Sequence, residues 1–303
     1  MLRILSPSQP NEADVEASFP PEGQFIPVRD WNMHCLTRGN GDDLVLLHGL
    51  GGSTRDMSFR FMPALEPHFR VTAIDRPAHG WTDGTDPASV VDPMEQAHLI
   101  WETLDAMGIS RPLVVGQSYG GAVSLAMALA RPGAARGYGL ISAASTDTVP
   151  LSWLHGSRLW LPLLSPMMAP MAALATDGMV QALVSHIFAP EPVPEHFLRD
   201  FGPRMTLRSK HRDHLIAQVS RLNPTLRSMM PSYRRIGEPV SIIHGTADRV
   251  LSFSENAGYL ANVLPRMRLV PLEGAGHMPH QTRTQDVVQA ILRLAKDAKN
   301  GCT

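Results

Sequence analysis

The chain has 303 residues, with 27 basic and 28 acidic side chains and 44% hydrophobic residues. This length allows a sizeable core, in one large domain or in one domain with an insertion. The near-zero net charge and the lack of a basic patch argue against nucleic-acid binding. No apolar run approaches the ~18 residues of a membrane span. Residues 1–23 lack the apolar stretch of a secretory signal, and Cys35 and Cys302 form no disulfide framework, so we expect a cytoplasmic protein.

The first half of the chain predicts strands that alternate with helices. Residues 1–22 are expected to form a loosely ordered arm. Asp92 and Pro93 are typical of a helix start, and that helix is predicted to end at Gly108. Two β-rich runs predict an edge hairpin, and four continuous apolar runs are typical of strands buried in a parallel sheet. The hairpin runs are 24–28 and 33–37, and the apolar runs are 43–47, 70–74, 113–115 and 139–142.

The alternation stops between Asp147 and Ile236, where prolines are frequent and apolar residues recur at helical spacing. We therefore predict a helical insertion over 147–236 that packs on a core formed by 23–146 and 237–303. The spaced residues are Met167, Met168, Met171 and Leu174, followed by Met179, Leu183 and Ile187. After the insertion the sequence predicts strands at 239–245 and 267–272 and helices at 254–264 and 281–299. The fold class is α/β, with a mostly parallel sheet covered by helices on both faces.

The stretch from Leu113 to Ala122 reads as a strand, then Gly-x-Ser-x-Gly, then a helix. A serine at such a turn is the nucleophile elbow of hydrolases. Side chains at Gly116 and Gly120 would collide within the turn, so glycine is needed at both positions. We therefore predict that Ser118 is a nucleophile held above the edge of the sheet.

A serine nucleophile needs a base, and the base needs a carboxylate that orients it. His277 lies in Gly-Ala-Gly-His directly after the last predicted strand, and Asp248 follows the strand before it. Both positions are at the carboxyl ends of strands, where open α/β sheets place their sites. Asp147 is an alternative acid, whereas Asp75 is better placed to brace the loop that follows it.

The reaction also needs two backbone N–H groups that stabilise an oxyanion. We expect these from Tyr119, directly after the nucleophile, and from Leu50 in the loop His-Gly-Leu-Gly-Gly at 48–52. That loop matches neither a dinucleotide-binding pattern nor a P-loop. His48 is interpreted as a structural residue that ties this loop down.

Three further residues, Gly49, Trp81 and His280, are candidates for substrate binding. His211 and His214 lie in a charged helix and are interpreted as part of a solvated face. No metal-type cluster of His and Cys occurs, and the sequence predicts neither a metal nor a cofactor.

These motifs together resemble the α/β-hydrolase superfamily. The resemblance covers residues 23–299 and includes the loops that contain His48, Asp75, Asp248 and His277 and the Ser118 elbow. It implies an eight-stranded, mostly parallel sheet with a helical cap after the sixth strand. The loop at Asp75 is similar to that of haloalkane dehalogenases and epoxide hydrolases, but those relatives use aspartate at the elbow. The serine instead resembles esterases, lactonases, C–C-bond hydrolases and perhydrolases.

We therefore predict a serine hydrolase of carboxylic esters, acting as a monomer or homodimer through Ser118, Asp248 and His277. The Met-rich insertion favours small to medium hydrophobic acyl groups, although the same residues are equally typical of packing within the cap. One alternative is a C–C hydrolase, lactonase or perhydrolase with the same triad, in which Arg158, Arg204 or Arg208 would bind a carboxylate. A second alternative is a non-catalytic binding or accessory protein with this fold.

Overall fold

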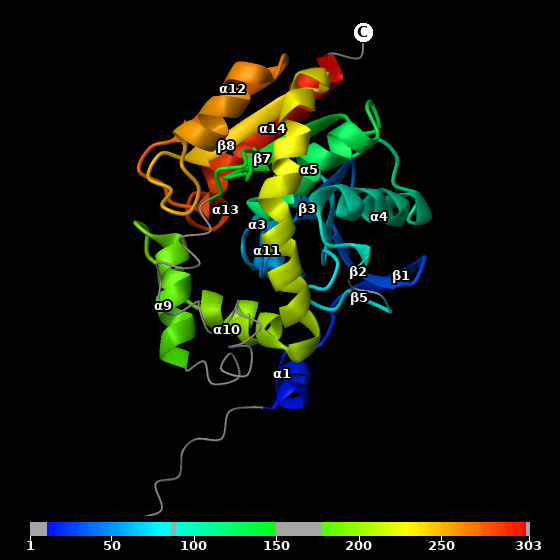
Figure 1. The fold of residues 1–303 in the computed structure, drawn as a ribbon, viewed down its shortest axis with the longest axis vertical. Coiled ribbons are helices and arrows are strands. Elements are labelled where there is room, and N and C mark those ends of the chain that lie inside the picture. The colour runs from blue at the N-terminus through cyan, green and yellow to red at the C-terminus, as the bar shows by residue number, and fades with distance from the viewer. Residues whose placement is uncertain (1–10, 86–88, 150–176, 301–303) are drawn as a thin grey trace, which may run out of the picture.

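The computed structural model describes residues 11–85, 89–149 and 177–300. It has a central, mostly parallel sheet with helices on both faces, as the sequence predicts (Figure 1). The strands are β1 (Gln24–Val28), β2 (Trp31–Arg38), β3 (Asp43–Leu47), β4 (Arg70–Ile74), β5 (Asp83–Gly84), β6 (Leu113–Gln117), β7 (Gly137–Ile141), β8 (Val240–Gly245) and β9 (Met267–Leu272).

The strands of the main path lie in the order β1-β2-β4-β3-β6-β7-β8-β9. The pairs from β4 to β9 are parallel, whereas β2 is antiparallel to both β1 and β4. The short β5 pairs with β2 outside this path. The expected eight strands are therefore present, with one two-residue strand in addition. The central position of β6 places the chain that follows it at the middle of the carboxyl edge.

The core consists of two hydrophobic layers, one on each face of the sheet. Along β3, Val45 and Leu47 belong to one layer, and Leu44 and Leu46 belong to the other, because successive side chains of a strand point to opposite faces. The helices that cover the faces are α2 (Thr54–Phe59), α3 (Phe61–Leu65), α4 (Pro93–Ala106), α5 (Tyr119–Ala130), the π-helical η4 (Ser254–Gly258), α12 (Tyr259–Val263), α13 (Pro279–Thr282) and α14 (Thr284–Asn300).

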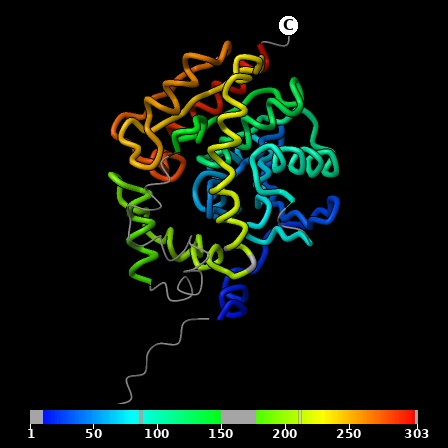
Figure 2. Tube along the Cα trace, in the orientation of Figure 1, coloured from blue at the N-terminus to red at the C-terminus, as the bar shows by residue number. Residues whose placement is uncertain are grey.

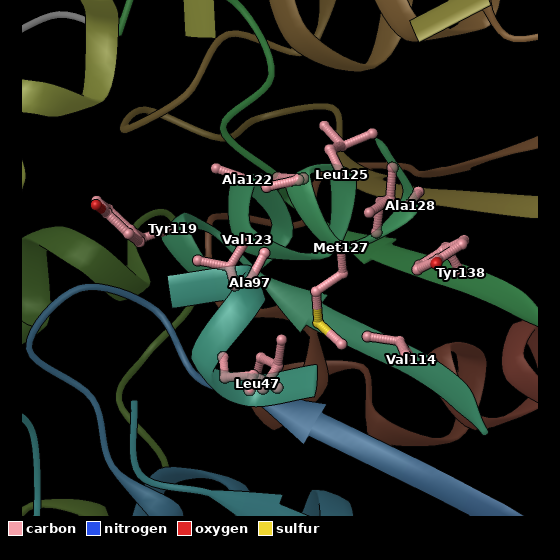
Figure 3. Packing of buried hydrophobic residues seen from close by; sticks show 14 of the residues in the cluster. Leu47, Ala97, Val114, Tyr119, Ala122, Val123, Leu125, Met127, Ala128 and Tyr138 are labelled. Carbon is pink, nitrogen blue, oxygen red and sulfur yellow. The ribbon is translucent and has the colours of Figure 1, made fainter. Parts of the chain in front are cut away.

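The layer under α4 and α5 fixes the helix that follows the elbow. Figure 3 shows Met127 of α5 directed toward Val114 of β6, and Val123 beside Ala97 of α4. All four side chains are fully buried. Helix α4 begins at a capping box of Asp92 and Glu95, as the Asp-Pro start predicts.

Between β7 and β8 the described chain is helical and contributes no strand to the sheet. It contains α9 (Asp177–Phe188), α10 (Phe197–Phe201), η2 (Pro203–Leu207), α11 (Ser209–Met229) and η3 (Met230–Arg235). Figures 1 and 2 show α9 and α10 away from the sheet, and the long α11 crossing in front of it. The predicted stripe from Met167 to Leu174, and Arg158, lie outside the described residues.

The segment before the hairpin is more ordered than the sequence analysis expects. Residues Glu12–Ser18 form α1, which Asn11 caps. Glu16 forms an ion pair with Arg208 of the insertion, and Glu12 accepts a hydrogen bond from the Ser209 amide. These long-range contacts explain the difference, because the sequence of the arm alone does not reveal its partner.

The interpretation of His211 and His214 as a solvated face is wrong. Their exposed fractions are 1% and 4%. The His214 ring lies 6.2 Å from the Trp31 ring, and His211 contacts the buried Arg208 guanidinium. The charged residues next to these histidines indicate a solvated helix. The histidines lie on the other side of α11, which packs on the hairpin. The predicted closing helix is also divided, because α13 ends before Arg283 and α14 begins after it.

Candidate active site

Ser118 lies in a strained turn between β6 and α5, with φ of 53° and ψ of −115°. A non-glycine residue with positive φ is uncommon and persists where its surroundings fix it. The Ser118 amide donates to the Ile141 carbonyl at 2.9 Å. A β-carbon on Gly116 would fall on the Gly120 carbonyl, and one on Gly120 on the Leu47 carbonyl. Both glycines are thus needed for the close approach of backbone, as the sequence predicts.

His277 lies in the loop after β9, and its Nε2 is 2.9 Å from the Ser118 hydroxyl oxygen. The loop packs closely against the insertion, since a β-carbon on Gly276 would lie 2.5 Å from the Ala189 carbonyl oxygen. Glu191, between α9 and α10, accepts hydrogen bonds from the Gly276 amide at 3.2 Å and from the Thr282 hydroxyl at 2.6 Å. Glu191 also pairs with Arg283 at 2.8 Å. The insertion therefore holds the histidine loop from outside.

Asp248 is buried and lies 2.8 Å from His277, measured from Oδ2 to Nδ1. Its Oδ1 accepts from the amides of Val250 and Leu251 at 2.8 and 2.9 Å. Burial alone would raise the pKa of Asp248. The attraction of His277 and the hydrogen bonds from His244 and His277 outweigh burial and hold that pKa well below its usual range. Asp248 is therefore an acceptor only, so His277 carries its proton on Nδ1 and its Nε2 is available to Ser118.

His244, at the end of β8, is not among the residues that the sequence predicts for the site. Its Nε2 lies 3.2 Å from Oδ2 of Asp248 and 3.0 Å from the Leu251 carbonyl oxygen. It therefore orients the same carboxylate that His277 contacts. A histidine four residues before the predicted acid is the sequence signal for this contact. Histidines at the ends of buried strands have the same spacing in other roles, so the signal does not identify the contact.

Asp147, the alternative acid, lies elsewhere. It accepts from the Arg227 guanidinium at 2.7 Å in an exposed ion pair. The carboxylate that accepts from His277 Nδ1 is that of Asp248 instead.

The predicted oxyanion loop is held by His48 and by the buried Arg76. His48 donates from Nδ1 to the Gly49 carbonyl at 2.8 Å, and its Nε2 accepts from the Arg76 amide at 2.9 Å. This pattern requires a neutral ring. Burial and the nearby Arg76 charge lower the pKa of His48 to about 4, which keeps the ring neutral. His48 is placed as a structural residue, as the sequence predicts.

Arg76 has no exposed surface, and its guanidinium donates to four oxygen atoms in the loop and in the helices beside it. Its Nε donates to the His48 carbonyl at 2.8 Å, and its Nη2 donates to the Gly49 carbonyl at 2.9 Å. Its Nη1 contacts Gln96 of α4 at 2.7 Å and Gln218 of α11 at 3.2 Å. One guanidinium thus connects the loop at 48–52 to the insertion.

Asp75 braces this region from the other side. Its carboxylate accepts from the amides of Thr54 and Trp81 at 2.6 and 2.8 Å, and from His34 Nδ1 at 2.7 Å. Burial raises the pKa of Asp75, but the bond to His34 and its charge outweigh burial and lower it. His34 Nε2 contacts the Glu22 carbonyl at 2.6 Å, so both ring nitrogens face acceptors.

A cavity of about 160 Å³ opens at Ser118 and His277, between the core and the insertion. Gly49 and Leu50 lie on its core side, and Met179, Leu183 and Ile187 lie on the insertion side. The described part of the Met-containing stripe is therefore cavity wall. Further lining residues are Gly51, Gly52, Asp56, Gln117, Val180, Val184, Phe188, Phe197, Phe201, Pro203, Thr206, Leu207, Leu215, Val250 and Met278.

Two of the three candidate substrate-binding residues are placed outside this lining. Trp81 donates from its indole to the Phe19 carbonyl at 3.0 Å, and its ring lies 5.3 Å from the Arg208 guanidinium. His280 has no exposed surface and contacts Asp56, which does line the cavity. Gly49 alone of the three lies in the wall, because Trp81 and His280 are turned toward other buried partners.

Among the described residues there is neither a metal-type cluster of side chains nor a helix suited to a membrane span. Within 11–85, 89–149 and 177–300, no group of three or more His, Cys, Asp or Glu side chains is arranged to hold a metal ion. Over the same part of the chain, no helix has the length and apolar character needed to cross a membrane.

Residues 43–284 match the model of the alpha/beta hydrolase fold family, so the chain belongs to that family. It is 29% identical over 274 residues to the magnesium-chelatase 30 kDa subunit of Rhodobacter capsulatus, covering 87% of this chain and 90% of that protein. It is 24% identical to the pimeloyl-[acyl-carrier protein] methyl ester esterase of Yersinia pseudotuberculosis, covering 88% and 98%. The enol-lactonase of Burkholderia xenovorans has a similar structure, with a TM-score of 0.72, 18% identity and coverage of 90% and 99%.

Proposed function

We propose that this protein is a serine hydrolase that cleaves carboxylic esters of small to medium hydrophobic acyl groups. The observation that carries the proposal is the hydrogen-bonded series Ser118, His277 and Asp248 at an apolar cavity. Esterases among the relatives support the same class of reaction. The proposal assigns the nucleophile to Ser118, the base to His277 and the orienting acid to Asp248.

In the proposed mechanism, the Ser118 oxygen attacks the ester carbonyl carbon while its proton passes to Nε2 of His277. The tetrahedral intermediate then collapses, the bond to the alcohol oxygen breaks, and His277 donates its proton to the departing alcohol. A water molecule next gives a proton to His277 and attacks the acyl carbon. Collapse of the second intermediate releases the acid and returns the proton to Ser118.

The amides of Leu50 and Tyr119 are the proposed oxyanion donors. Tyr119 is the first residue of α5, so its N–H lies at the positive end of a 12-residue helix. Leu50 lies in the loop that His48 and Arg76 hold. Within the described part of the chain, neither N–H donates a backbone hydrogen bond. Two fixed donors of this kind stabilise a developing negative charge at little cost in reorganisation.

The insertion over 147–236 is proposed to act as the cap that shapes the acyl site. A cavity of about 160 Å³ is close to the roughly 150 Å³ that holds one benzene molecule in a protein core. Its wall on α9 carries Met179, Leu183 and Ile187. These apolar walls favour small to medium hydrophobic acyl groups.

The test is labelling with a fluorophosphonate probe, together with hydrolysis of p-nitrophenyl esters of increasing acyl length. We expect one label per chain, on Ser118, and a rate maximum at short to medium acyl groups. The Ser118→Ala variant should lose both. A protein that folds but is neither labelled nor hydrolytic would refute the proposal.

The alternative substrates of the same triad are C–C bonds and lactones. Two of the arginines considered for binding a substrate carboxylate are placed outside the cavity lining: Arg204 pairs with Asp177, and Arg208 pairs with Glu16. This placement favours an ester that carries no carboxylate. Parallel assays with esters, lactones and ring-fission products would distinguish these reactions.

One observation favours a non-catalytic accessory role, namely the relative in Rhodobacter capsulatus that is named as a magnesium-chelatase subunit. An accessory protein would not need a reactive serine. Failure of the probe to label Ser118 in the folded wild-type protein would favour this second role over the hydrolase.

A further inference from the structure

One carboxylate lies in the otherwise mostly apolar wall of the cavity. Asp56, in α2, lines the cavity, and only 2% of its surface is exposed. Asp56 is not among the residues that the sequence predicts for the site. A buried carboxylate is unfavourable unless hydrogen-bond donors surround it, so its partners decide what it does.

The partners of Asp56 satisfy one of its two oxygens. Oδ1 accepts from Gln281 Nε2 at 2.9 Å and lies 3.3 Å from His280 Nε2. The Gln281 amide also donates to the Asp56 backbone carbonyl at 2.7 Å, which fixes the side chain of Gln281. No donor from the described part of the chain reaches Oδ2.

The neighbouring His280 contacts this carboxylate through one ring nitrogen only. Nδ1 of His280 is buried and, among the described residues, has no hydrogen-bond partner. Nε2 is therefore the ring nitrogen that faces Asp56, and it reaches Oδ1 alone. Asp56 is thus a carboxyl group against apolar walls, with Oδ1 held by protein donors and Oδ2 without a donor from the described residues.

We propose that Asp56 forms a subsite that binds a hydrogen-bond donor on the substrate, either a hydroxyl group or, more strongly, an ammonium group. A bound donor would complete the coordination of Oδ2, whereas a carboxylate on the substrate would be repelled. This inference rests on the proposed function, because it names the substrate class of the same cavity. It predicts esters with a polar, donor-bearing end on an otherwise apolar chain.

The first experiment measures binding without chemistry. The Ser118→Ala protein is titrated calorimetrically at pH 7.5 with hexylammonium, 1-hexanol and hexanoate, which share one apolar chain. We expect hexylammonium to bind at least about tenfold more tightly than hexanoate, with hexanol between them. Equal binding of the three, tighter binding of hexanoate, or no binding by any of them would overturn the proposal. This comparison needs no change at Asp56.

A matched variant then tests the residue itself. In Ser118→Ala/Asp56→Asn, the preference for hexylammonium should fall about tenfold while hexanol binding changes less. A preference that survives in the folded double variant would overturn the assignment to Asp56.

The second experiment uses the active enzyme. We compare kcat/KM for the p-nitrophenyl ester of 6-aminohexanoate with kcat/KM for that of heptanoate. We expect Asp56→Asn to lower the first value relative to the second about tenfold. An unchanged ratio would contradict the subsite. If wild-type protein hydrolysed neither ester, the proposed function would fail, and the binding titration would still decide the subsite.

Discussion

The replacement of Arg76 by methionine tests how the oxyanion loop is held. Arg76 is fully buried and donates to the carbonyls of His48 and Gly49 and to the side chains of Gln96 and Gln218. Methionine fills a similar length but donates nothing. The Gly49 carbonyl keeps its bond from His48 Nδ1, whereas the other three oxygens lose the donor that Arg76 supplies.

The expected magnitude follows from those three acceptors. Each buried oxygen left without its donor costs about 1–3 kcal/mol. Burial of the Arg76 charge is itself unfavourable, since it lowers the pKa of Arg76 to about 10. Removal of that charge therefore offsets part of the loss in stability. We therefore expect Arg76→Met to lower the free energy of unfolding by about 3 kcal/mol. Because the loop carries the proposed donor Leu50, kcat should also fall.

The assay is urea unfolding followed by circular dichroism, with Gln218→Leu and the double variant as partners. Gln218→Leu alone should cost about 1 kcal/mol, and the double variant should cost at least about 1 kcal/mol less than the two separate losses together. This coupling arises because the amide oxygen of Gln218 loses its donor in Arg76→Met. A loss below about 1 kcal/mol for Arg76→Met, or losses that add within about 0.5 kcal/mol, would refute the reasoning.

Three further outcomes are expected. Asp248→Asn should lower kcat by about 10³–10⁴-fold, while Asp147→Asn should leave it within about twofold, and the reverse result would make Asp147 the acid. Unfolded chains bind a proton on histidine near pH 6.5, and folded His48 binds one only near pH 4. Acidification across this window should therefore cost up to about 3 kcal/mol of stability, and His48→Gln should flatten the pH profile of urea midpoints. Gly120→Ala should lower the melting temperature by more than about 10 °C, since its β-carbon would overlap backbone, and normal melting would contradict that overlap.

The sheet and the elbow could be predicted from the sequence because their signals are local. The apolar run at 43–47 matches β3 from end to end, and the Asp-Pro start of α4 forms the expected cap. The spacing of Ser118, Asp248 and His277 relative to strands also predicted that the three side chains meet. Their catalytic roles stay predictions until the labelling experiment tests them.

The remaining features depend on contacts that no local pattern contains. His244 reaches Asp248 because the loop after β8 turns back over the strand end. Asp56 acquires its partners from α13, more than 200 positions further along the chain. Trp81 turns toward the N-terminal segment instead of the cavity. Composition and periodicity report burial along one element, but they do not report which distant element covers it.

The contacts between Glu191 and the histidine loop have a consequence for exchanging segments between related hydrolases. Glu191 contacts Gly276, Thr282 and Arg283, and Gln218, on α11 of the insertion, contacts Arg76. A transplanted insertion without these two side chains would fit the chain ends and still remove a contact from each of the two loops around the serine. The helices between β7 and β8 are therefore not an interchangeable module, and a working chimera must carry both attachment points.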